Sequence, residues 1–295
     1  MSSVLTLRLA GPLQAWGSSA RFTRRTTESA PTKSGVVGLL ASALGRPRRS
    51  DLSDLAALRF GVRIDQPGAR VRDFQTAHHP ETGKSMPVSE RFYLSDAVFV
   101  AAVEGDAELL VRLRDAVRAP VFLPFLGRRS CPPSGPIDLG LHEDVEVSEA
   151  LAAETWQASD WYQRQRSEEE TVELTALLEG VPGDGPAEGS LRDQPVSFDP
   201  AHRRYALRSV VSEPVRVRNP RHRPDRRPAR TRRPVTPPAH DPTAALTSAV
   251  DEGTPGGRAV PQAMADAATV DPASADPASG DRSPGEQEQP GTEGF

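Results

Sequence analysis

The sequence predicts an α+β fold of the ferredoxin-like type, followed by a smaller β-rich region and a disordered tail. Segments in which apolar residues alternate with period two predict strands, and two longer apolar segments with capping residues predict helices. Their order is strand, helix, three strands, helix and strand, which is close to the split βαβ pattern. After about Val215 the apolar periodicity stops, and Pro, Arg, Ala, Asp and Ser predominate.

The first strand and the first helix have the clearest patterns. Alternating leucines predict a half-buried strand over residues 4–9. An apolar segment over residues 35–44 predicts a helix, with Ser34 as its N-cap and Gly45 as its stop.

The later elements follow from the same rules. Alternation predicts strands over 60–65 and 71–75, then a polar excursion over 76–90 and a longer strand over 91–103. Asp106 caps a second helix that ends at Pro120, and residues 121–123 start a last strand. Residues 145–156 have a helical pattern, and residues 205–211 have that of a strand.

We therefore divide the chain into three parts. Residues 1–140 form the ferredoxin-like domain, with a β-hairpin near 74–93. Residues 141–215 form a C-terminal subdomain that completes the fold. Residues 216–295 are predicted to be a disordered tail, first rich in Arg and Pro and then acidic.

Charge is distributed in blocks. Residues 1–140 contain 19 Lys and Arg against 13 Asp and Glu, whereas residues 141–215 contain 6 against 16. The basic part of the folded chain is where a phosphate backbone would bind. The single cysteine, Cys131, excludes an intrachain disulfide, and no apolar segment has the length of a membrane span. With no signal peptide recognised at the N-terminus, we expect a cytoplasmic protein.

Two glycine-containing loops and one helix start can bind a polyanion. Residues 11–17 place Gln14 and Trp16 in a glycine-bounded loop, where they could contact an unpaired base or, alternatively, Trp16 could be core. Residues 127–133 form a basic, restrained turn. The helix start at residues 33–35 has free N–H groups that suit a phosphate, although the segment by itself favours an ordinary capped helix. We expect the opening segment, which contains residues 11–17 and 33–35, and the basic turn at residues 127–133 to border one face of the predicted sheet.

The excursion holds residues that suit metal-free RNA cleavage. His78, His79, Lys84 and nearby Tyr93 are of the types that act as general acid or base. An exposed hairpin with no catalytic role is the alternative. The histidines are too few and too close together for a zinc site, so we expect no metal. The Arg-Pro block over 216–233 could bind nucleic acid non-specifically, or be neutralised by the acidic segment after it.

Several of these segments together carry a family resemblance. They are residues 7–17 (LRLAGPLQAWG), 31–35 (PTKSG), 72–74 (RDF), 91–96 (RFYLSD) and 126–132 (LGRRSCP), in that order. They resemble the type I-E branch of the fifth CRISPR-associated (Cas) protein family, within the RAMP superfamily, over residues 4–211.

The resemblance implies an RRM-like RAMP domain with a thumb hairpin, and a non-catalytic subunit of the Cascade surveillance complex in antiviral defence. Such a subunit caps the 5′ handle of the CRISPR RNA, contacts the backbone subunit CasC and the large subunit CasA, and meets target DNA through the complex. The alternative is a metal-independent endoribonuclease that processes precursor RNA, as in type I-C relatives. No cofactor is implied, and residues 76–90 would be a short thumb.

The residues expected to contact RNA lie in or near the family motifs. They are Gln14, Trp16, Arg24, Lys33, Ser34, Arg72, Gln75, Arg128, Arg129 and Ser130.

Overall fold

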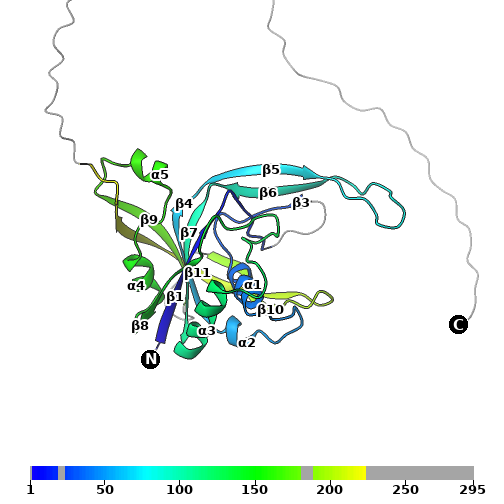
Figure 1. The fold of residues 1–295 in the computed structure, drawn as a ribbon, viewed down its shortest axis with the longest axis horizontal. Coiled ribbons are helices and arrows are strands. Elements are labelled where there is room, and N and C mark those ends of the chain that lie inside the picture. The colour runs from blue at the N-terminus through cyan, green and yellow to red at the C-terminus, as the bar shows by residue number, and fades with distance from the viewer. Residues whose placement is uncertain (1, 19–23, 181–188, 224–295) are drawn as a thin grey trace, which may run out of the picture. The chain divides into compact units, whose positions relative to one another are not determined.

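The computed structural model describes residues 2–18, 24–180 and 189–223 of the 295-residue chain (Figure 1). Its large sheet contains seven strands: β1 (Ser2–Ala10), β4 (Arg59–Gln66), β7 (Val98–Asp106), β8 (Asp138–Glu143), β9 (Thr171–Glu179), β10 (Gly189–Ser197) and β11 (Arg204–Arg218). They have the order β10-β11-β9-β4-β7-β1-β8, and every pair of neighbours is antiparallel.

Four of these strands and two helices are connected as two interleaved split βαβ units. Helix α1 (Lys33–Ala43) joins β1 to β4, and β7 lies between those two strands in the sheet. Helix α3 (Ala107–Arg118) joins β7 to β8, with β1 between them. This is a mixed α/β structure with the connectivity that the split βαβ pattern requires. The strands of the region after residue 140 extend the same sheet, because β9 pairs with β4.

Each face of the large sheet has its own hydrophobic cluster. Leu5, Leu7 and Leu9 of β1 pack on the side of α1 and α3. Val4, together with Val100 of β7, faces the cluster that contains α4 (Val147–Ala153). The alternation in β1 and the continuous apolar run in β7 follow from this arrangement, since successive strand residues point to opposite faces. Short helix α2 (Ser53–Ala56) buries Leu55 in the first cluster.

A smaller sheet is formed by β2 (Leu13–Gln14), β3 (Arg24–Arg25), β5 (Ala69–Gln75) and β6 (Ser89–Ser95). Strands β5 and β6 pair over seven positions and make a long hairpin that extends away from the large sheet (Figure 1). Every residue of β5 is exposed. The hairpin expected near residues 74–93 is therefore present and begins earlier in the chain than expected.

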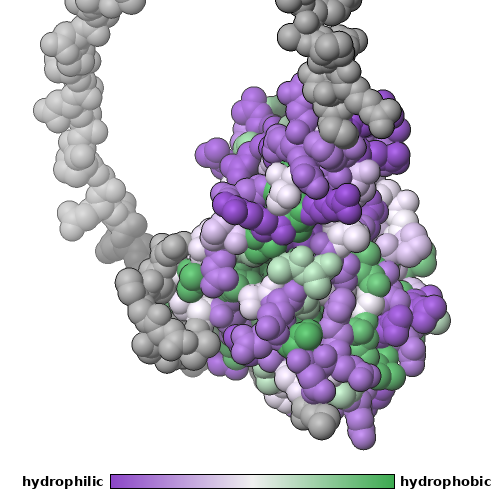
Figure 2. Space-filling model, turned by 90° about the vertical axis from the view of Figure 1, so that its left-hand side faces the viewer, coloured by the Kyte–Doolittle hydropathy of each residue, from purple (hydrophilic) through white to green (hydrophobic). Residues whose placement is uncertain are grey.

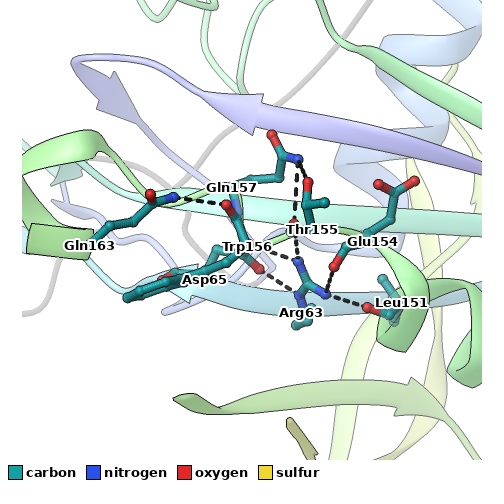
Figure 3. A network of polar contacts seen from close by, with 8 residues as sticks. All are labelled: Arg63, Asp65, Leu151, Glu154, Thr155, Trp156, Gln157 and Gln163. Atoms are coloured by element: carbon teal, nitrogen blue, oxygen red, sulfur yellow. Dashed lines mark hydrogen bonds and ion pairs between the residues drawn. The ribbon is translucent and has the colours of Figure 1, made fainter. Parts of the chain in front are cut away.

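A buried arginine attaches the α4 region to β4 (Figure 3). Arg63 is fully buried and makes a bidentate ion pair with Asp65, at 2.7 and 2.9 Å. Its guanidinium also donates to the carbonyl of Leu151 in the last turn of α4, and to those of Glu154 and Thr155, which follow the helix. Because these carbonyls lack helical partners, one side chain satisfies the helix end and fixes its position.

The segment after α4 also donates hydrogen bonds to Asp65 of β4. Trp156 donates its indole N–H to the Asp65 carbonyl at 3.0 Å, and the Gln157 N–H donates to the Asp65 carboxylate at 2.6 Å (Figure 3). Gln163 in α5 (Asp160–Gln165) donates to the Trp156 carbonyl at 2.9 Å. The 150–165 region is thus linked to the sheet through polar contacts as well as apolar packing.

Four sequence expectations are corrected. Residues 121–123 are an exposed loop, and the last strand of the split pattern is β8. The strand expected over 91–103 is two strands, β6 and β7, because Asp96 between them has a φ of 54°. The N-cap of α1 is Thr32, whose hydroxyl accepts from the Gly35 N–H at 3.3 Å, and Ser34 lies inside the helix. Strand β11 continues to Arg218 and buries Val217, so the folded part extends beyond residue 215.

The rest of the predicted tail, residues 224–295, lies outside the described residues. Within the described ranges, no helix is long and apolar enough to cross a membrane. On the side that carries α4 and α5, hydrophobic residues at the surface are interspersed with hydrophilic ones (Figure 2).

Candidate nucleic-acid interface

The opening segment and the turn around Gly127 meet in space, as expected from the sequence. The Ala15 N–H donates to the Leu126 carbonyl at 3.1 Å. Gly127 has a φ of 84°, and a Cβ built on it would lie 1.7 Å from the Ala15 oxygen. Only glycine allows this contact, both for its backbone conformation and for the space available. The two segments therefore form one surface, held by backbone interactions.

Gln14 and Trp16 hold this loop from inside. Both are fully buried. The Gln14 amide donates to the Leu9 and Ala97 carbonyls at 3.1 and 2.7 Å, and its oxygen accepts from the Trp16 indole at 3.0 Å. A Cβ on Gly35 would lie 2.8 Å from the Trp16 ring, so the ring packs closely against the start of α1. Of the two alternatives for Trp16, these contacts favour a core residue over one that contacts an unpaired base. Gln14 is its buried hydrogen-bond partner.

The start of α1 already has an anionic partner within the chain. The Lys33 N–H donates to the Asp193 carboxylate at 2.8 Å, in the position where a phosphate was expected. The Lys33 ammonium is buried and pairs with both oxygens of Glu179 at 3.0 Å. Burial lowers the pKa of Lys33 below its usual value, against the opposing effect of Glu179. Ser34 is buried and lines the edge of the surface groove described below.

The adjacent arginines of the Gly127 turn have different surroundings. Arg128 donates to the Phe92 and Arg25 carbonyls at 3.1 and 2.9 Å, and its guanidinium lies 4.6 Å from the centre of the Tyr93 ring. Arg129 is exposed, and no ion pair joins it to any described residue. Arg128 therefore connects the turn to β3 and β6, whereas Arg129 is available to a ligand.

Ser130 is exposed beside buried Cys131. Burial raises the pKa of the Cys131 thiol, which keeps it protonated and favours a packing role over a nucleophilic one.

The expected residues of the smaller sheet lie on the hairpin and its neighbour β3. Arg24 and Arg72 both approach Glu90, at 3.9 and 3.8 Å, and each guanidinium lies over a phenylalanine ring. Gln75 is exposed at the end of β5. These three residues form a polar surface along the hairpin.

The structure does not bring the four nuclease candidates together. His78, His79 and Lys84 are exposed in the hairpin tip, where the His79 N–H donates to the Lys84 carbonyl at 2.9 Å. Tyr93 is buried and pairs with Val71, four positions from the last pair of the hairpin, Gln75 and Ser89. At about 3.3 Å per residue, Tyr93 is roughly 13 Å from the base of the tip.

The described surface has a groove of about 1550 Å³. Its walls come from the loop after Trp16, one side of α1, the segment 122–129 and the β10–β11 hairpin. None of the described residues that line it is acidic. Eight arginines line it: Arg25, Arg46, Arg48, Arg128, Arg129, Arg192, Arg203 and Arg204. A groove lined in this way attracts a polyanion.

Six of these arginines were not predicted as site residues. Arg46 and Arg48 follow the glycine stop of α1, in a short basic run that the sequence displays. Arg192, Arg203 and Arg204 belong to residues 141–215, which contain 16 acidic residues. Because this part of the chain is acidic, the charge distribution did not predict a phosphate-binding site there. Arg25 is adjacent to Arg24, and only Arg24 was predicted to contact RNA. Among the described residues, no group of three or more His, Cys, Asp or Glu side chains could hold a metal ion.

Comparison with known proteins gives consistent matches. The family model described as CRISPR-associated protein (Cas_Cas5) matches residues 4–211. The Cascade subunit CasD of Escherichia coli K12 is 40% identical over 172 residues, which are 51% of this chain and 76% of CasD.

Two solved structures agree with this. A crystal structure of a Cas protein is 38% identical with a TM-score of 0.56, and covers 74% of this chain and 97% of its own. A chain of a CRISPR RNA-guided surveillance complex is 30% identical with a TM-score of 0.60, and covers 76% and 95%. The chain therefore belongs to the Cas5 family of CRISPR-associated proteins, in its type I-E branch.

Proposed function

We propose that this protein is a non-catalytic, RNA-binding subunit of a type I-E Cascade complex, and that it caps the 5′ handle of the CRISPR RNA. The observation that carries the proposal is the groove, where two segments about a hundred residues apart meet. Eight arginines line it, and none of its described lining residues is acidic. The relatives that it resembles include a Cascade subunit and a chain of an RNA-guided surveillance complex.

Within this proposal the β5–β6 hairpin corresponds to the thumb of a ferredoxin-like RAMP domain. Its exposed β5 strand and the arginines around Glu90 give it a polar surface that reaches beyond the large sheet (Figure 1). The thumb and the groove would together hold the handle and present it to CasC and CasA, with target DNA met through the assembled complex.

The RNA site is best tested at exposed groove arginines. Lys33 is unsuited because its charge is used inside the fold, and Arg128 is unsuited because it holds the turn. We expect the full-length double variant Arg25→Glu/Arg129→Glu to bind handle RNA more weakly. Each lost phosphate contact lowers the slope of log K against log salt by about 0.7 for single strands.

The readout is nuclease protection of the handle in the assembled complex, together with the salt slope for the purified chain. Unchanged protection and an unchanged slope in a folded variant would contradict the site assignment. A matched control is Arg112→Glu/Arg218→Glu, which makes the same charge change at two exposed arginines outside the groove.

The non-catalytic part of the proposal has its own test. Repeat RNA is incubated with the purified chain in EDTA, and the products are sized. We expect no discrete product, because Tyr93 is buried far from the hairpin tip and the histidines bond within that tip. A discrete product that the His78→Ala/His79→Ala variant loses would establish the endoribonuclease instead.

A further inference from the structure

The groove continues past the Gly127 turn to a wall that neither the family motifs nor the predicted site residues include. This wall consists of the β10–β11 hairpin and the loop after α1. It contributes Arg48, Arg192, Arg203 and Arg204 to the groove, all of them exposed. No ion pair joins any of these four side chains to a described residue, unlike Arg46, which is paired with Asp54 at 2.5 Å.

Arginines that have no ion pair with a described residue and gather on one concave surface repel one another, and a bound polyanion removes that repulsion. The wall is also fixed in place rather than loosely attached. A Cβ on Gly38 of α1 would lie 3.6 Å from the Phe198 ring, so this ring packs against the helix. Arg208 and Asp193 pair at 2.8 Å across β11 and β10, and the same Asp193 accepts from the Lys33 N–H. The arginines are thus held on a surface that is rigidly connected to α1.

Aromatic side chains lie among these charges. The rings of Phe198 and Tyr205 have their centres 6.2 Å apart, and both line the groove. Burial raises the pKa of Tyr205, against the opposing effect of the Arg203 and Arg48 charges. Phe122, which also lines the groove, is 56% exposed. Arginines interleaved with aromatic rings are the combination that holds single-stranded nucleic acid by its phosphates and bases.

The size of the groove points to an extended ligand. Pockets for small molecules usually have volumes of about 300–1000 Å³, and this groove has about 1550 Å³. Because the wall and the Gly127 turn border the same groove, one strand can follow both.

We propose that the β10–β11 wall is a second RNA-binding surface, on which Arg48, Arg192, Arg203 and Arg204 bind the phosphates of the single strand that leaves the Gly127 turn. The inference rests on the proposed RNA-binding function and extends it to a defined path. A protein partner with an acidic surface is the alternative occupant.

The test uses the full chain assembled with its CRISPR RNA and partner subunits. The variant is Arg192→Glu/Arg204→Glu, and its control is Arg112→Glu/Arg218→Glu. Backbone protection is mapped by hydroxyl-radical footprinting, and the salt slope is measured for the full-length chain with single-stranded repeat RNA. Thermal melting establishes that each variant is folded.

We expect the wall variant to lose protection at nucleotides next to those that Arg25→Glu/Arg129→Glu exposes, and to lower the salt slope by about 1.4, from two phosphate contacts of about 0.7 each. The control should change neither. If the Arg25/Arg129 variant changes the footprint and the wall variant does not, the wall does not bind RNA, although the proposed function stands. If neither changes it, both proposals are wrong. Loss of a partner subunit with an intact footprint would make the wall a protein-binding surface.

Discussion

The buried basic residues of this protein form ion pairs that stabilise the fold, whereas several exposed arginines on the groove have no such pairs with described residues. Arg63, Arg208 and Lys33 are buried, and each has a carboxylate within 3.0 Å. Arg129, Arg192 and Arg204 are exposed on the groove without ion pairs to described residues. A buried charge without a partner costs several kcal/mol, so the first group had to be paired for the chain to fold. The arginines of the second group are exposed, so their charges can interact with an anionic ligand.

This contrast changes how the basic N-terminal part of the chain is interpreted. An excess of Lys and Arg over Asp and Glu identifies a region that attracts nucleic acid, but it does not say which side chains do so. Burial and pairing make that distinction. Substitutions of buried residues and of the turn that holds the groove arginines test this distinction.

The strongest test of the buried group is Arg63→Leu. The substitution removes the ion pair with Asp65 and leaves three carbonyls near the end of α4 without their donor. Removing one partner of a buried pair costs about 3–5 kcal/mol in the free energy of unfolding. Urea unfolding followed by circular dichroism measures this loss as a lower midpoint.

The matched control for this test is Arg216→Leu. Arg216 and Glu173 are both exposed, at 78% and 59%, and lie 3.4 Å apart. An exposed pair contributes about 0–1 kcal/mol. Equal losses in the two variants would contradict the distinction between buried and exposed basic residues.

A second test separates the geometry of the groove from its charge. Gly127→Ala adds a methyl group that would lie 1.7 Å from the Ala15 oxygen, at a φ of 84°. We expect a loss of about 1–3 kcal/mol in the free energy of unfolding, the usual cost of a strained backbone. RNA affinity should also fall, because Arg128 and Arg129 are displaced while no charge changes.

The control is Gly135→Ala, eight positions later in the chain, where an added Cβ meets no atom of the described part of the chain within 4 Å. Stability from thermal melting and affinity from RNA titration should both be unaffected there. An RNA affinity that is unchanged in Gly127→Ala would mean that the turn does not position the binding arginines.

The sequence predicted the main elements well because local patterns determined them. The alternation of Leu5, Leu7 and Leu9 predicted β1, and Asp106 was correctly expected to cap α3, where it accepts from the Leu109 N–H at 3.0 Å. Residues 121–123 have the composition of a strand but lie exposed in a loop, because β8 takes the edge of the sheet beside β1. Pairing of this kind depends on distant residues, which no local pattern contains.

The candidate site was predicted less well, for the same reason. Lys33 and Gln14 lie in motifs of the family, so they were expected to lie near the RNA. Their partners, Glu179 for Lys33 and the Ala97 carbonyl for Gln14, are 146 and 83 residues away. The groove arginines of β10 and β11 were missed because they reach the groove only once β9 has paired with β4. The meeting of the Gly11–Gly17 and Gly127 segments was predicted, because both can border one face of a split βαβ sheet.

The smallest expected effect comes from Lys33→Met, which tests a basic residue inside the site whose charge serves the fold. Methionine fills similar space but removes the ammonium from Glu179, which keeps the Phe60 N–H at 3.0 Å among the described residues, so we expect a loss on the order of 1 kcal/mol at neutral pH. RNA affinity should be unchanged. Because burial lowers the pKa of Lys33 below 10.5, the unfolded chain binds more protons than the folded chain just below that pH. The wild-type protein should therefore gain stability relative to Lys33→Met as the pH rises toward 10.5. Urea midpoints of both proteins from pH 8 to about 10 measure this difference, and a difference that shrinks with pH would show that Lys33 is not buried as a costly charge.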